Sequence, residues 1–192
     1  MNETKRLVVL TGASGFVGRA LTRAFLSQGD DLLALGRTAE SLESLQAGVQ
    51  DLHLVRNQLR PLRVDLLDQD AVPHVIQAVT ESGSRELVLI NNARNRANLV
   101  TESGSVGLRN AFVAEYALGV IVPFELSIAL SHRFGSRLRA VVNIGSQYGL
   151  VAQNPLLYED YPSESAPQYG ATKAALFQLT RDLSVRLGDL GT

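Results

Sequence analysis

The sequence predicts an α/β fold: a doubly wound, parallel sheet of at least five strands, covered by helices on both faces. Five short apolar runs rich in leucine, valine and isoleucine recur along the chain, as is typical of parallel strands that are buried on both faces. Helical patterns separate these runs, and such βαβ units require right-handed crossovers. We therefore expect the strand order 3-2-1-4-5. A chain of 192 residues can bury one sizeable core, so one domain over residues 1–192 is expected.

The spacing of apolar residues gives approximate bounds for each element. Pro123 is expected to kink the longest helix, because proline lacks the backbone donor. Residues 49–60 show no decisive pattern, and the polar segments 94–107 and 147–168 are expected to be loops. The expected strands are 7–10, 32–35, 62–66, 86–90 and 138–144, and the expected helices are 19–28, one that Thr38 caps, 69–82, 110–134 and 169–187.

The first strand runs directly into a glycine-rich turn, LVVLTGASGFVG. Gly12 would allow the tight turn, Gly15 a close approach of the backbone to a pyrophosphate, and Gly18 the packing of the next helix on the strand. A plain strand-to-helix turn can also use glycine, so this motif alone leaves both interpretations open.

Composition excludes several classes of function. Lys plus Arg (18) and Asp plus Glu (19) give a net charge of −1, which does not favour nucleic acid or an anionic membrane surface as a partner. The sequence has no cysteine, and its three histidines lack metal-ligand spacing, so no metal site is expected. The N-terminal apolar run is too short for a signal peptide, and we expect no membrane-spanning stretch and a cytoplasmic protein.

Three polar residues near the end of the chain could act on a substrate. Tyr169 and Lys173 are four residues apart on one helix, so their side chains share a face. A nearby ammonium favours the phenolate form of a tyrosine, which helps the tyrosine to exchange a proton near neutral pH. Ser146 follows the fifth strand, at the sheet edge where open α/β folds bind ligands. Taken singly, each is better explained as an ordinary surface or turn residue.

The order of the motifs resembles the short-chain dehydrogenase/reductase family over essentially the whole chain. The motifs are TGASGFVG after the first strand, Asp65 after the third, NNA after the fourth, NIGS after the fifth and YGATK on the following helix. The resemblance implies a Rossmann-like, NAD(P)-binding domain. It also implies contributions from sixth and seventh strands that this chain does not contain, so we expect either a piece of a longer protein or a reduced relative with an exposed fifth strand.

The resemblance also implies roles for individual residues. Tyr169 would be the general acid/base, Lys173 would assist it and hold the nicotinamide ribose, and Ser146 would polarise the reacting oxygen. The cofactor-binding residues it implies are Thr11, Gly12, Ser14, Gly15, Phe16 and Gly18 around the diphosphate, Asp65 and Leu66 near the adenine, Asn92 and Ala93 on the ribose side, and Tyr169 with Lys173.

Cofactor choice depends on the end of the second strand. A site that prefers NAD places a carboxylate there, whereas this chain has Gly36 followed by Arg37. An arginine suits a 2′-phosphate, so we expect NADP(H) in preference to NAD(H). The alternative is that Arg37 is a solvated residue near a helix start.

The chain departs from the family pattern at several positions. The glycine spacing TGxxGxxG matches the extended or atypical branches, whose members often act on nucleotide-linked sugars, and Tyr169 follows Ser146 by an unusually long interval of 23 residues. Arg94 occupies the glycine position of the motif NNAG, and Gly119 stands where an asparagine often completes the catalytic group.

These features leave three hypotheses about function. The first is an NADP(H)-dependent oxidoreductase that interconverts a carbonyl and a secondary alcohol, with a small-molecule substrate that could be derived from a sugar. The second is an epimerase or dehydratase of nucleotide sugars, and the third is a non-catalytic dinucleotide-binding relative. The apolar positions of helix 110–134 exceed one face, so a homodimer or homotetramer is expected.

Overall fold

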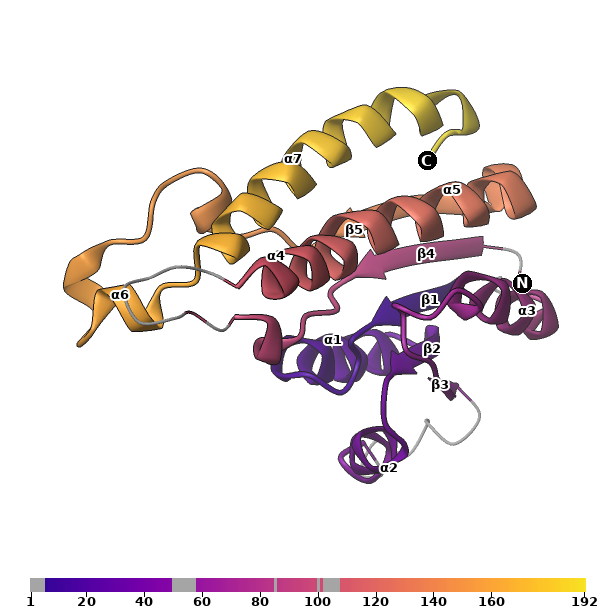
Figure 1. The fold of residues 1–192 in the computed structure, drawn as a ribbon. Coiled ribbons are helices and arrows are strands. Elements are labelled where there is room, and N and C mark those ends of the chain that lie inside the picture. Colours follow the sequence, from indigo (N-terminus) through magenta and orange to yellow (C-terminus); the bar gives the residue numbers. More distant parts are fainter. Residues whose placement is uncertain (1–5, 50–57, 85, 100, 102–107) are drawn as a thin grey trace.

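A five-stranded parallel sheet forms the centre of the molecule, in the order β3-β2-β1-β4-β5 (Figure 1). The structure is a computed structural model and describes residues 6–49, 58–84, 86–99, 101 and 108–192. The observed order confirms the sequence-based prediction. The strands are β1 (Arg6–Thr11), β2 (Asp31–Gly36), β3 (Leu59–Arg63), β4 (Glu86–Asn91) and β5 (Leu138–Asn143).

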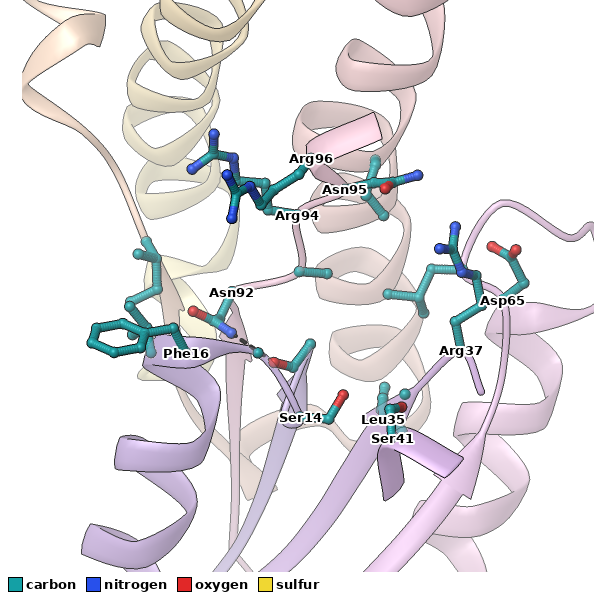
Figure 2. Close-up of a pocket in the computed structure, with 18 of the residues that line it drawn as sticks. Ser14, Phe16, Leu35, Arg37, Ser41, Asp65, Asn92, Arg94, Asn95 and Arg96 are labelled. Carbon is teal, nitrogen blue, oxygen red and sulfur yellow. Dashed lines mark hydrogen bonds between the residues drawn. The ribbon is translucent and has the colours of Figure 1, made fainter. Parts of the chain in front are cut away.

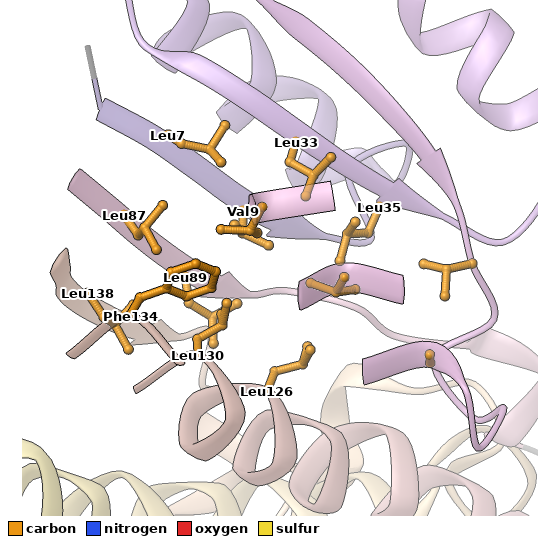
Figure 3. Close-up of a cluster of buried hydrophobic side chains, with 14 of the residues drawn as sticks. Leu7, Val9, Leu33, Leu35, Leu87, Leu89, Leu126, Leu130, Phe134 and Leu138 are labelled. Carbon is orange, nitrogen blue, oxygen red and sulfur yellow. The ribbon is translucent and has the colours of Figure 1, made fainter. Parts of the chain in front are cut away.

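Alternate residues of the strands feed two hydrophobic cores, one on each face of the sheet. On one face, Leu7 and Val9 pack with residues of two helices that include Val75 and Leu126 (Figure 3). On the other face, Val8 and its alternate neighbours pack against α1 and α2. The longer helices are α1 (Phe16–Ser27), α2 (Ala39–Ala47), α3 (Ala71–Ser82), α4 (Arg109–Tyr116), α5 (Val122–Phe134) and α7 (Pro167–Leu187).

The third strand is displaced from its predicted position. Residues 62–66 were expected, whereas β3 spans Leu59–Arg63, and Asp65 lies just beyond its end. Pro61 is part of the strand and is aligned with Ala34 of β2. Because β3 is an edge strand, a residue without a backbone donor can be accommodated there. Two thirds of the segment that had no decisive pattern, residues 50–57 of 49–60, lies outside the described residues.

The helix ends also differ from the predicted ones, because glycine and proline positions set them. The first helix begins at Phe16 instead of residue 19, and the last begins at Pro167, where proline suits the first turn. The predicted loop 147–168 contains short helical turns, and the described part of segment 94–107 contains another. The turn in segment 94–107 is η1 (Arg96–Asn98), and those in segment 147–168 are η4 (Gln147–Gly149), η5 (Pro155–Leu157) and α6 (Tyr161–Glu164). The short turns η3 (Gly135–Arg137) and η6 (Gly188–Leu190) lie outside these segments.

The long helix that was predicted over 110–134 is interrupted by a π-helical turn. α4 leads into η2 (Ala117–Ile121), which has π geometry, and then into α5. Pro123 lies directly after this turn and cannot donate the backbone hydrogen bond to the preceding turn. The prediction was a kink at Pro123; what the structure shows is a π turn over residues 117–121, which places Gly119 beside α7.

By length and composition alone, the helical run Arg109–Arg137 could cross a membrane, with a mean hydropathy of 1.7 in its most apolar window. The expectation that no stretch would pass this test was wrong. The run packs one side on the sheet, because Leu126 and Leu130 are fully buried in the core. A core helix of this kind satisfies the same criterion as a membrane span.

Candidate active site

The glycine-rich turn after β1 is held in a conformation that requires its glycines. Gly12 has a φ of 64°, in the left-handed region, and a Cβ there would lie 2.8 Å from the Cα of Ala93. A Cβ at Gly18 would lie 2.2 Å from the carbonyl oxygen of Gly12. The turn, the start of α1 and the residues after β4 therefore approach each other as closely as glycine permits.

Hydrogen bonds from two side chains fix this turn to the end of β4. The Thr11 hydroxyl accepts from the backbone N–H groups of Asn92 and Ala93, each at 2.9 Å. The Asn92 amide donates to the carbonyl oxygens of Thr11 and Gly12, each at 3.1 Å. Thr11 is almost fully buried, so its observed contacts position the loop.

A cavity of about 530 Å³ opens beside this turn at the carboxyl ends of the strands (Figure 2). This is the sheet edge where open α/β folds bind ligands. Of the predicted site residues, Thr11, Gly18 and Ser146 do not line it. Those that do are Gly12, Ser14, Gly15, Phe16, Arg37, Asp65, Leu66, Asn92, Ala93, Tyr169 and Lys173.

The residues of this cavity fit a nicotinamide dinucleotide. Gly15 caps α1 without a side-chain hydrogen bond, and the first helical residues, Phe16 and Val17, line the cavity. Unpaired N–H groups at a helix N-terminus favour a phosphate group. The glycines leave room for close approach, and the cavity extends from this turn to Tyr169 and Lys173.

One end of the cavity lies over the carboxyl ends of β2 and β3, where Figure 2 shows Arg37 and Asp65. Thr38 and Ser41 line the same end, and the Thr38 hydroxyl caps α2 by accepting from the Ser41 N–H at 3.3 Å. Sequence reasoning had assigned Thr38 only as a cap and had not assigned Ser41 to the site. Their position directly after Arg37 is the signal that could have included them.

Lys173 occupies the other end of the cavity and is held in place by the backbone of the sheet. Its Nζ donates to the carbonyl oxygen of Ile144 at 2.6 Å, and the residue is only 9% exposed. Burial lowers the pKa of Lys173, the charge of Glu115 opposes this effect, and the charge of Arg94 adds to it. The lysine is therefore a buried, oriented ammonium and is not a solvated surface charge.

Tyr169 lies among the charged groups of this end. Its ring centroid is 4.4 Å from Cζ of Arg94 and 5.8 Å from Nζ of Lys173. The ring of Tyr148 meets it edge-on at 6.5 Å, and Tyr148 lines a second cavity of about 470 Å³. Tyr169 therefore lies between the cavity beside the glycine turn and this second hollow.

Ser146 follows β5, as predicted, but its hydroxyl has a local partner. The Ser146 Oγ accepts from the backbone N–H of Tyr148 at 3.3 Å and so caps the short helix η4. Its neighbours Ile144 and Gly145 line the cavity. The structure thus places Ser146 next to the site with its oxygen engaged in a cap.

A buried carboxylate that sequence reasoning did not select acts on two residues of the site, Arg94 and Lys173. Glu115 on α4 is 3% exposed, and its Oε2 has no hydrogen-bond partner among the described residues. Burial raises the pKa of Glu115, while Arg94, Asn98 and Lys173 oppose that rise. Glu115 is one of two acidic residues in the apolar helical pattern 110–134, with Glu125, and this was the available signal.

Replacing Glu115 by glutamine is expected to change how stability depends on pH. Because the pKa of Glu115 is raised above its usual 4.5 in the folded chain, the unfolded chain ionises first as the pH increases. As the pH rises from 4.5 to the folded-state pKa of Glu115, the free energy of unfolding of wild type therefore decreases. Glu115→Gln lacks this decrease, because glutamine does not ionise. Urea unfolding of both proteins between pH 4.5 and neutrality should show the variant gaining stability relative to wild type; a constant difference contradicts this account.

An asparagine at position 119 would have no room in this structure. A Cβ at Gly119 would lie 2.4 Å from Cγ2 of Thr172, a residue of α7 that is almost fully buried. The π turn brings the helix against α7 at this point. The side chain of Thr172 therefore occupies the space that a larger residue at position 119 would need. Glu115 lies one turn earlier on the same helical run.

Comparisons with known proteins agree with this geometry. The family model "short chain dehydrogenase" matches residues 6–191. A 2-(R)-hydroxypropyl-CoM dehydrogenase of Xanthobacter autotrophicus is 30% identical over 94% of this chain and 68% of its own length. An NADPH-dependent 1-acyldihydroxyacetone phosphate reductase of Schizosaccharomyces pombe is 28% identical over 98% of this chain.

A solved structure shares both the fold and part of the sequence. It is a short-chain dehydrogenase from Sphingobium yanoikuyae in complex with NADPH, with 27% identity and a TM-score of 0.75, covering 97% of this chain and 67% of that one. The chain spans only 57% of the Schizosaccharomyces pombe reductase. From the family match over nearly all of its length, the chain belongs to the short-chain dehydrogenase family.

Proposed function

We propose that the protein is an NADP(H)-dependent oxidoreductase that interconverts a carbonyl group and a secondary alcohol. The observation that carries this proposal is that Tyr169 and Lys173 line the same cavity as the glycine-rich turn. A dinucleotide bound along this cavity would have its phosphates at the turn and its reactive ring near the tyrosine.

Each residue then has a defined task. Tyr169 moves a proton to or from the substrate oxygen, and the ammonium of Lys173, fixed by the Ile144 carbonyl oxygen, orients the ribose and favours the tyrosinate. Ser146 is proposed to donate a hydrogen bond to the reacting oxygen, which its hydroxyl can do while its lone pair accepts from Tyr148. The nicotinamide supplies the hydride.

The proposal is tested by assaying the purified chain for NADPH consumption against a panel of ketones and aldehydes. Carbonyl-dependent consumption supports the oxidoreductase. Binding of NADPH without any turnover supports a non-catalytic relative, which Arg94 and the closed position at Gly119 favour. Turnover of a nucleotide sugar without net consumption of cofactor would instead indicate an epimerase or dehydratase.

Arg37 is proposed to select NADP(H) by binding the 2′-phosphate together with the hydroxyl of Thr38, which lines the same end of the cavity and accepts from Ser41 while its O–H remains available. The NADPH complex of the Sphingobium yanoikuyae relative supports this choice. We expect Arg37→Ala to raise KM for NADPH by about tenfold or more, the size of a lost charge-assisted hydrogen bond, with a smaller effect for NADH. Steady-state kinetics with both cofactors measure this, and an equal change for the two cofactors would contradict the assignment.

We also propose that the protein forms a homodimer or homotetramer through α4 and α5. Several large apolar side chains of this run are at least a third exposed, among them Val113, Tyr116 and Ile121, and exposed apolar side chains on one helical run favour an interface. Light scattering at micromolar concentration should give at least twice the mass of one chain. A monomer would refute this assembly.

A further inference from the structure

Arg94 places a cation at the reacting end of the cavity. It follows Asn92 and Ala93 after β4, is exposed, and lines the cavity with Arg96. Its guanidinium lies over the ring of Tyr169, with Cζ 4.4 Å from the ring centroid. This cation–π contact uses no oxygen acceptor, so the N–H donors of the guanidinium stay available for a ligand.

The donors of these two arginines are not consumed by the protein. Among the described residues, the guanidinium groups of Arg94 and Arg96 make no hydrogen bond or ion pair with another side chain or carbonyl oxygen. Figure 2 draws both side chains at the same end of the cavity, above Asn92. Two guanidinium groups that line the same end of a cavity suit an oxyanion, which arginine can bind with two parallel hydrogen bonds.

The local charges are unbalanced in favour of an anion. Arg94, Arg96 and Lys173 are cationic, and the carboxylate whose charge acts on both Arg94 and Lys173 is Glu115. The charge of Arg94 also disfavours the protonated form of Lys173. An anionic group bound beside Arg94 would reduce this repulsion and would be attracted by all three cations.

The position of Arg94 separates this anion from the phosphates of the cofactor. Arg37 lies at the opposite end of the cavity, over β2 and β3 (Figure 2). The glycine turn and the start of α1 already offer backbone donors for a diphosphate. The stacking of Arg94 on Tyr169, in contrast, places its charge beside the group that would act on the substrate.

We propose that Arg94, assisted by Arg96, binds an oxyanion of the substrate, so that the enzyme acts on carbonyl compounds or alcohols that carry a carboxylate, phosphate or sulfonate group. This inference rests on the proposed oxidoreductase function. The side chain of Arg94 holds the anionic group, which directs the neighbouring carbonyl oxygen toward Tyr169. Arg94 is therefore a specificity residue of the same site.

The test compares a matched pair of substrates, 3-oxobutanoate and its neutral methyl ester, with NADPH. For Arg94→Ala, the ratio of kcat/KM for the acid to that for the ester should fall by about tenfold to a hundredfold, the effect of one charge-assisted contact. For Arg94→Lys, this ratio should fall by less. Arg133→Ala is the control, because Arg133 is exposed and also stacks on a ring, that of Phe134 at 5.8 Å, but lies outside the cavity; its ratio should stay unchanged.

A binding measurement separates this inference from the activity itself. Calorimetric titration of the NADP⁺ complex with 3-hydroxybutanoate should give an affinity that Arg94→Ala weakens by about the same factor. If this holds while no carbonyl is reduced, the anion site stands and the oxidoreductase proposal fails. An unchanged acid-to-ester ratio, or a loss of NADP⁺ affinity in Arg94→Ala as large as the loss of 3-hydroxybutanoate affinity, would overturn the inference.

Discussion

Tyr169→Phe is expected to abolish measurable turnover while leaving the affinity for NADPH nearly unchanged. The substitution removes one hydroxyl and keeps the ring that stacks with Arg94 and meets Tyr148. Because a positioned general acid or base contributes about a hundredfold to ten-thousandfold to a rate, kcat should fall by that amount. Stopped-flow or steady-state assays of NADPH oxidation, together with a fluorescence titration of cofactor binding, measure the two quantities.

Tyr116→Phe is the matched control, because it makes the same chemical change at an exposed tyrosine of α4. Its turnover should equal that of wild type. Near-normal turnover of Tyr169→Phe would show that another group handles the proton and would remove the main support for the proposed mechanism.

Gly18→Ala is expected to be among the most damaging single-methyl additions in this chain. A Cβ at this position would lie 2.2 Å from the carbonyl oxygen of Gly12 and 2.7 Å from that of Ala13, so β1 and α1 must separate. Overpacking of this kind typically costs about 1–3 kcal/mol, and backbone neighbours that cannot rotate away favour the upper end. NADPH affinity should fall by about tenfold or more, since the turn that holds the diphosphate is displaced.

Gly188→Ala provides the comparison for this effect. Gly188 has a φ of −57° and no heavy atom within 4 Å of an added Cβ, so alanine should be neutral or stabilise the protein by about 0.4–1 kcal/mol. Urea unfolding of both variants, with NADPH titrations, tests the pair. Equal stability of Gly18→Ala and wild type would show that helix and strand are not packed as closely as the structure indicates.

The fold could be predicted from the sequence because its signals are local. Apolar runs in which consecutive residues such as Leu7 and Val8 face opposite cores define strands that are buried on both faces, and right-handed crossovers restrict the possible strand orders. The misplaced strand β3 has a physical reason, because Pro61 weakens the pattern of an edge strand and pairing with β2 sets its actual register. Pairing partners of this kind are not visible in a linear pattern.

The sequence predicted the glycine-turn end of the candidate site better than the end near Tyr169. Glycine spacing led directly to Gly12 and Gly18, because few other residues can occupy those positions. The contacts of Arg94, Glu115 and Thr172 depend on how the π turn brings α4 and α5 against α7. Such contacts arise only from tertiary packing, so the sequence could name Arg94 and Gly119 as departures but could not show what accompanies them.

Transfer of deuterium from NADPH labelled at the reactive ring carbon to a carbonyl substrate tests the central claim most directly. If the cavity beside the glycine turn holds the nicotinamide next to Tyr169, the alcohol product should carry one deuterium on its carbinol carbon, from one face of the ring only. Tyr169→Phe should bind the labelled cofactor and give no labelled alcohol. Tight binding of NADPH by wild type, without label in any product of the carbonyl panel, would contradict the account.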